Sequence, residues 1–171
     1  MEKHLIYVTT GTCHFNFDRM LDLVKKCVNE LDENTYDLTL QYGTSNETAM
    51  HCMTEVAEFL SRERSEYLYE HAKFVFSHCG IGSIYNSLKY NTPTIIIPRL
   101  AKYGEFSDDH QLQIANEIKD NPLIFMLDEG NDNYIEEFML FIRKFENIQK
   151  CEVDLINYEL ANKMKSVLYK D

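Results

Sequence analysis

Hydrophobic residues follow two periods along the chain, and the change from one to the other predicts where strands and helices lie. Short unbroken apolar runs, such as residues 5–8 and 94–97, are typical of strands buried in a parallel sheet. Apolar residues that recur every three or four positions, as between residues 17 and 31, are typical of helices with one buried face. The pattern predicts strands at 4–10, 36–42, 53–59, 73–77, 94–97 and 123–126. It predicts helices at 17–31, 62–72, 83–90, 108–119, 133–145 and 153–169.

This alternation of strand and helix predicts an α/β fold, a Rossmann-like, doubly wound and mostly parallel sheet of six strands. The 171 residues suit one domain, 1–171, and contain no repeat or linker. In such sheets ligands lie outside the carboxyl ends of the strands. The turns after the predicted strands should therefore meet at one edge, with Gly11 close to residues 80–83.

Two helix starts can be read from capping residues. Residues 51–60 are ambiguous between helix and strand, and we favour a strand because Ser61 is then a plausible N-cap for the next helix. Either Ser107 or Asp108 is expected to cap the helix that ends near Lys119.

Composition narrows the class of protein. Seventeen basic and 28 acidic residues give a net charge of −11, which argues against binding to nucleic acid or to an anionic membrane surface. No apolar stretch approaches the roughly 18 residues of a membrane span, and the first residues do not resemble a signal peptide. The sequence therefore predicts a cytoplasmic protein, and any attachment to a membrane would come through a partner or an amphipathic surface.

The five cysteines are scattered and form no Cys-x-x-Cys pair, so we expect free thiols and no metal site. Cys79 lies within a glycine-rich turn, where a small buried residue is a better interpretation than a nucleophile. No cofactor is indicated.

The most informative segment runs from Phe74 to Ala115 and reads as strand, glycine turn, helix, strand, polar loop, helix. Gly80 and Gly82 would allow a tight turn and a close approach of main-chain N–H groups to an anion. The following helix would point its positive N-terminal end at this turn. The segment therefore predicts a diphosphate site.

An ordered set of motifs gives this segment its specificity: residues 78–83, Pro98-Arg99, residues 103–105 and residues 108–111. The set resembles the nucleotide-sugar-binding half of GT-B glycosyltransferases of family 28. It is most similar to small subunits of bacterial exopolysaccharide and capsule glycosyltransferases, and to the catalytic subunit of the eukaryotic dolichol-linked N-acetylglucosamine transferase. Residues 6–12 resemble that family's opening strand and turn, so the likeness covers about residues 4–126.

The resemblance implies roles for individual residues. The nucleotide and its phosphates would contact Gly11, Thr12, His78, Gly80, Gly82, Ser83 and Asn86. The sugar would contact Arg99, Asp109, His110 and Gln111. His14 is the catalytic candidate, although relatives often have histidine one place earlier, where this chain has Cys13; a loop histidine without a role is the alternative. Arg99 could instead neutralise a phosphate or meet the partner, and His78 could cap main-chain groups.

Two positions depart from the family pattern. Asn86 stands where related enzymes commonly have a glutamate that accepts from both ribose hydroxyls, and an amide replaces that contact only in part. Asn91 stands where glycine is usual, and asparagine tolerates the left-handed conformation that glycine would adopt there.

The leading functional hypothesis is a metal-independent hexosyltransferase subunit that transfers sugar from a UDP-sugar to a lipid-linked saccharide in surface polysaccharide biosynthesis. Because a GT-B enzyme needs two halves, a membrane-associated subunit would supply the acceptor site and hold this chain at the inner face of the membrane. The alternatives are a non-catalytic enhancer of such an enzyme and an unrelated, flavodoxin-like nucleotide-binding module.

Overall fold

The computed structural model describes residues 3–146, so the predicted helix at 153–169 lies outside the described residues. Six strands form one entirely parallel sheet in the order β3-β2-β1-β4-β5-β6. The strands are β1 (His4–Thr9), β2 (Tyr36–Gln41), β3 (Met53–Ala57), β4 (Phe74–His78), β5 (Thr94–Ile97) and β6 (Ile124–Met126). This confirms the predicted Rossmann-like, doubly wound sheet.

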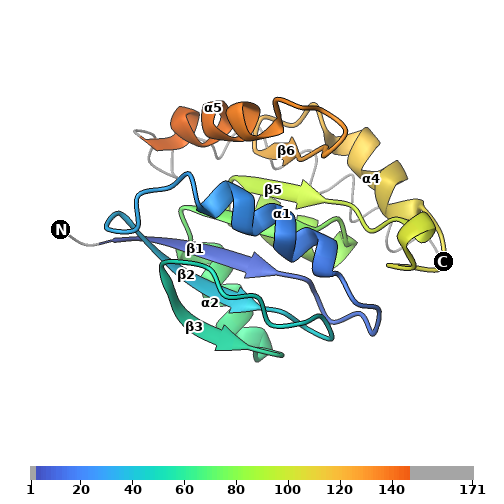
Figure 1. The fold of residues 1–171 in the computed structure, drawn as a ribbon, viewed down its shortest axis with the longest axis horizontal. Helices are drawn as coiled ribbons and strands as arrows, with labels where there is room; N and C mark the ends of the chain where they lie inside the picture. Colours follow the sequence, from blue (N-terminus) through green and yellow to red (C-terminus); the bar gives the residue numbers. More distant parts are fainter. Residues whose placement is uncertain (1–2, 147–171) are drawn as a thin grey trace.

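Helices cover both faces of the sheet (Figure 1). They are α1 (Asp18–Val28), α2 (Arg62–His71), α3 (Ile81–Lys89), α4 (His110–Ile118) and α5 (Tyr134–Glu146), with a short 3-10 turn, η1 (Ala101–Tyr103). The apolar sides of α1 and α5 pack on one face, while α2, α3 and α4 pack on the other. Among the described residues, no helix is long and apolar enough to cross a bilayer.

Alternation within the central strands explains why the sheet is covered on both faces. In β1, Ile6 and Val8 join the core beneath α1, whereas Tyr7 joins the core beneath α2. In β5, Ile95 faces the first of these cores and Ile96 the core beneath α3 and α4. Each of these side chains is fully buried, which is the reason for the unbroken apolar runs in the sequence.

The predicted helix starts are confirmed for α2 and wrong for α3 and α4. Ser61 caps α2 as expected, since its hydroxyl accepts from the main-chain N–H of Arg64 at 3.1 Å. The prediction that Ser107 or Asp108 caps α4 is wrong, because the helix begins at His110 with Asp109 at the capping position. Helix α3 begins at Ile81 and not at Ser83, so Gly80 is its N-cap. Asn91 has φ +51°, the left-handed conformation expected for it.

Candidate active site

The two glycine-containing turns meet around the ring of His78, at the end to which the strand arrows in Figure 1 point. A Cβ atom added to Gly11 would lie 2.4 Å from Cε1 of His78, and one added to Gly80 would lie 2.3 Å from Nε2. Gly11 has φ +80°, which an L-residue rarely adopts. The predicted approach of the first turn to residues 80–83 is confirmed, and both glycines are required because the imidazole fills the space between them.

The N-terminal end of α3 has the properties of an anion site. The main-chain N–H groups of Ile81, Gly82 and Ser83 find no acceptor among residues 3–146, as expected for the first turn of a helix. A Cβ added to Gly82 would meet nothing within 4 Å, so this turn is open. Free N–H groups and the helix dipole together favour a negatively charged ligand here.

His78 is held neutral. Burial and the nearby charge of Arg99 lower its pKa to about 4, while a hydrogen bond with the Thr9 main chain acts in the opposite direction. At neutral pH the imidazole therefore has one N–H donor and one acceptor nitrogen. Its one N–H donates to the Thr9 main chain, so the ring offers a ligand neither a further hydrogen-bond donor nor a positive charge.

Ser83 and Asn86 lie on successive turns of α3. The hydroxyl of Ser83 lies 3.5 Å from Nδ1 of His78, so it belongs to the floor of the turn and does not cap the helix. Asn86 is half-buried within α3. Both side chains remain candidates for contact with the nucleotide.

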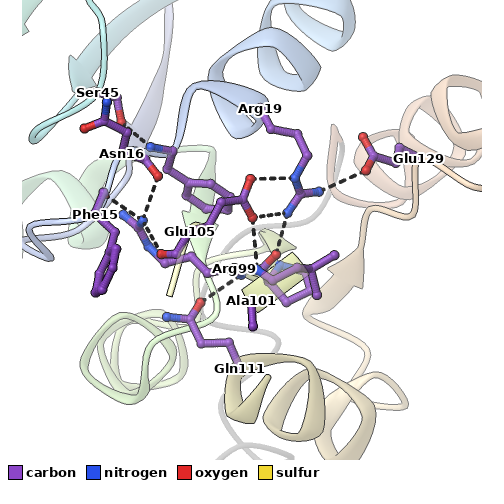
Figure 2. A network of polar contacts seen from close by, with 12 residues as sticks. Phe15, Asn16, Arg19, Ser45, Arg99, Ala101, Glu105, Gln111 and Glu129 are labelled. Atoms are coloured by element: carbon purple, nitrogen blue, oxygen red, sulfur yellow. Dashed lines mark hydrogen bonds and ion pairs between the residues drawn. The ribbon is translucent and has the colours of Figure 1, made fainter. Parts of the chain in front are cut away.

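Arg99 has a different place from the one predicted. Its guanidinium is enclosed, with 1% of the residue exposed, and lies 4.4 Å from the centroid of the Phe17 ring. The Nη atoms donate at 2.8–3.3 Å to main-chain carbonyls of Thr10, Phe15, Asn16 and Glu105 (Figure 2). We therefore correct its direct role in sugar binding: Arg99 holds the first loop, residues 10–17, and contributes to the ligand only the field of its charge.

Gln111 likewise supports the site from below. Only 3% of it is exposed, and its Oε1 accepts the main-chain N–H of Arg99 at 3.1 Å (Figure 2). This occupies the amide oxygen and leaves the amide N–H2 group as the part of Gln111 that could meet the sugar, so its predicted contact stays a prediction.

Glu105 and Arg19 complete this network above Arg99. The two carboxylate oxygens of Glu105 accept from Nε and Nη2 of Arg19, both at 2.7 Å, and one also accepts from the Leu100 N–H at 2.9 Å. Nη2 of Arg19 reaches the carbonyl of Pro98 at 2.8 Å. The pair thus ties α1 to the loop after β5.

Asp109 and His110 lie at the start of α4 and have different partners. Asp109 accepts the main-chain N–H of Ala101 at 2.8 Å, so its carboxylate also holds the loop after β5. His110 is partly exposed and pairs through Nδ1 with the carboxylate of Asp108. Of the four predicted sugar contacts, Arg99 and Gln111 are buried, whereas Asp109 is exposed and His110 is partly exposed. His110 could reach a ligand through Nε2.

Thr12 and His14 are exposed in the first loop. An aromatic chain links this loop to α4: His14 lies against Phe15, Phe15 against Phe106, and Phe106 against His110, with ring centroids 4.4, 5.7 and 4.8 Å apart. The first loop and the start of α4 therefore form one continuous surface.

Some residues of the site were missed in the sequence. Gln41 is buried in β2, where its amide donates to the carbonyl of Gly11 at 3.1 Å and its Oε1 accepts from the hydroxyl of Tyr7. A glutamine near the end of a predicted strand, just before the turn at Gly43, was the available signal. Phe59, 47% exposed after β3 and beside Gly43, gave no signal beyond its aromatic ring.

Cysteine chemistry plays no part in this arrangement. Cys79 is buried, which raises its pKa to about 12, as expected for a structural thiol. Cys13, Cys27, Cys52 and Cys79 are free thiols. Within residues 3–146, no three His, Cys, Asp or Glu side chains gather in a way that could hold a metal ion.

Comparison with known proteins agrees with this geometry. The chain superposes on the glycotransferase of kitacinnamycin with a TM-score of 0.65 and 15% identity, over 96% of this chain and 40% of that one. It superposes on the calicheamicin glycosyltransferase CalG4 with a TM-score of 0.53 and 10% identity, over 98% and 44%. No curated protein sequence matches it.

These similarities at low identity show the fold, and the chain spans less than half the length of either enzyme. It therefore corresponds to one half of a GT-B fold. A sequence model of the glycosyltransferase family 28 C-terminal domain matches residues 5–123, well over half of the chain. The unrelated flavodoxin-like reading is thereby excluded, and the chain belongs to the glycosyltransferase family 28 C-terminal domain family.

Proposed function

We propose that this protein is the donor-binding subunit of a hexosyltransferase that moves a sugar from a UDP-sugar to a lipid-linked saccharide in surface polysaccharide biosynthesis. A membrane-associated partner supplies the acceptor site and keeps the protein at the cytoplasmic face of the membrane. No metal ion takes part in the transfer.

One observation carries the proposal: the open N-terminal end of α3 meets the first glycine turn around a neutral His78. The oxygens of a diphosphate at this point would accept hydrogen bonds from the N–H groups of residues 81–83. They would also lie at the positive end of the helix dipole. The enclosed charge of Arg99 adds to the same field. These fixed donors would stabilise the departing UDP without a divalent cation.

The rest of a UDP-sugar has candidate contacts on either side of this turn. Asn86 lies further along α3 and would face the ribose, while the exposed ring of Phe59 offers a surface on which a base can stack. His110 would face the hexose. His14 is the candidate base at the acceptor side, since its ring lies exposed on the first loop.

The test is UDP binding by the Gly82→Val variant, measured by calorimetry. Because a side chain at Gly82 meets nothing within the protein, valine should leave the free energy of unfolding unchanged or slightly higher. It would occupy the path of the phosphate, so we expect UDP binding to be lost.

Lys89→Val is the matched control, because Lys89 is exposed at the other end of the same helix. It should bind UDP as the wild type does. Equal affinity of Gly82→Val and wild type would exclude the diphosphate site at this turn.

A non-catalytic enhancer is the second candidate, and Asn86 is the observation that favours it. If the ribose contact is retained, Asn86→Glu should tighten UDP binding, because a carboxylate accepts from both hydroxyls. An enhancer would instead show weak UDP binding in the wild type and no gain in the variant.

A further inference from the structure

Asp108 has no assigned role in the site, yet its carboxylate determines the state of His110. Oδ1 accepts the main-chain N–H of His110 at 3.0 Å and also contacts Nδ1 of the same residue. The hydrogen bonds to His110 lower the pKa of Asp108, so this carboxyl is ionised at neutral pH. An ionised carboxylate can only accept hydrogen bonds, so the proton of the imidazole must be on Nδ1.

The fixed proton defines what His110 presents to a ligand. With Nδ1–H turned to Asp108, the other ring nitrogen is Nε2, which is an acceptor whenever the ring is neutral. The ring is held from the side by Phe106, at 4.8 Å between centroids, and remains partly exposed.

We propose that Asp108 is a positioning residue that makes His110 Nε2 a hydrogen-bond acceptor for a hydroxyl group of the donor sugar. This rests on the proposed function and names the polarity of its sugar contact. The sugar must then donate a hydrogen bond to Nε2 of His110. A hexose with a hydroxyl group at this position can do so, whereas a sugar with only a hydrogen-bond acceptor there cannot.

Solution NMR of protein labelled with 15N in its histidine rings tests the first half of the inference. The two ring nitrogens of a neutral imidazole have well separated shifts, so the protonated one is identified directly; His110→Gln assigns the signals. We expect Nδ1–H in the wild type. Asp108→Ala should convert His110 to the Nε2–H form, whereas Asp108→Asn, whose amide oxygen can still accept, should retain Nδ1–H.

Asp120→Ala is the control, because Asp120 is exposed just beyond the far end of α4. It should leave the His110 signals unchanged. A wild-type ring protonated on Nε2, or an Asp108→Ala ring that keeps Nδ1–H, would overturn the assignment of Asp108.

Calorimetry with UDP, UDP-glucose, UDP-galactose and UDP-N-acetylglucosamine tests the second half. We expect at least one UDP-hexose to bind more tightly than UDP, and Asp108→Ala to weaken it by roughly 2- to 10-fold, the scale of one hydrogen bond. UDP itself should bind equally to both proteins.

The outcomes separate the two proposals. Failure of the wild type to bind UDP would refute the donor site as a whole. Normal UDP binding with no preference for any hexose, or with equal hexose affinity in Asp108→Ala, would leave the donor site standing and overturn the role of Asp108.

Discussion

At the residue scale, His78 shows how a packing requirement and a chemical property coincide. The ring fits between Gly11 and Gly80, where any added Cβ would collide with it. The same enclosure, together with the charge of Arg99, disfavours the imidazolium and lowers the pKa to about 4. The neutral ring beside the open turn is thus a consequence of how tightly the two turns approach.

This shift has a measurable consequence for stability. The pKa of His78 is about 6.5 in the unfolded chain and about 4 in the folded protein. Between these two pH values, His78 is protonated in the unfolded chain and neutral in the folded protein. The free energy of unfolding should therefore fall as the pH decreases through this window, by about 1.4 kcal/mol for each pH unit at most.

We expect urea denaturation at roughly pH 7 and pH 5 to reveal a loss of about 2 kcal/mol from this residue alone. His78→Gln is the comparison, because glutamine does not titrate and the contributions of other groups cancel in the difference. Identical pH dependence of the two proteins would mean that His78 is not held neutral.

At the element scale, the first loop is shaped by side chains that come from other strands and loops. Arg99, after β5, and Gln41, in β2, donate hydrogen bonds to main-chain carbonyls of this loop. The Thr44 hydroxyl donates to the carbonyl of Cys13, and the Ser45 hydroxyl accepts the N–H of Phe17. The carbonyls of this loop are thus turned toward the protein, and its conformation depends on these partners.

We predict that Arg99→Met destabilises the protein by about 3–5 kcal/mol, because four main-chain carbonyls lose a charged donor in a buried place. Hydrogen exchange should accelerate for the amides of residues 11–17 before it does so elsewhere. Arg99→Lys, which has a single ammonium, should be intermediate and keeps the test usable if the methionine variant does not fold.

Arg62→Met provides the control for this prediction. Arg62 is exposed and pairs with Glu66 one helical turn away, so its loss should change the free energy of unfolding very little. Unchanged exchange rates in residues 11–17 of Arg99→Met would show that the loop holds its shape without the arginine.

At the scale of the whole molecule, the candidate contacts lie beyond the carboxyl ends of the strands. The chain spans less than half the length of the two-halved enzymes that it resembles in fold. On the proposed function, one side of a bound donor lies uncovered until a second subunit closes over it. Water exclusion and acceptor binding would then come only from the assembled enzyme.

We therefore expect the purified chain to bind UDP and yet to show negligible sugar transfer. Adding the membrane-associated partner with a lipid-linked acceptor should restore transfer, measured as labelled sugar that enters the lipid fraction. Robust transfer by the chain alone would refute the half-enzyme proposal. Full activity of a complex that contains Gly82→Val would instead assign this chain to the enhancer class.

Much of the fold followed from local signals in the sequence. Short apolar runs located central strands such as β1 and β5, because parallel strands there are buried on both faces. β3 has no such run, and it was located only because Ser61 marked the start of α2, where its hydroxyl accepts a nearby N–H. The meeting of Gly11 with residues 80–83 was also predictable, since parallel strands place their following turns at one edge.

What the sequence determined by itself was this set of short-range properties: the periods of strand and helix, the need for glycine in the turns and the family pattern. The tertiary structure alone decided which polar side chains are free to meet a ligand. Arg99 stands in a motif that resembles a sugar site, but its guanidinium is bound inside the protein by main-chain carbonyls of the first loop. The contact of Asp108 with His110 is local by comparison, since the carboxylate accepts the first N–H of α4 and also contacts the imidazole of the same residue. The role of Arg99 depends on partners that folding brings within hydrogen-bond reach, and the carbonyls of Thr10, Phe15 and Asn16 are more than 80 residues away from it in the chain.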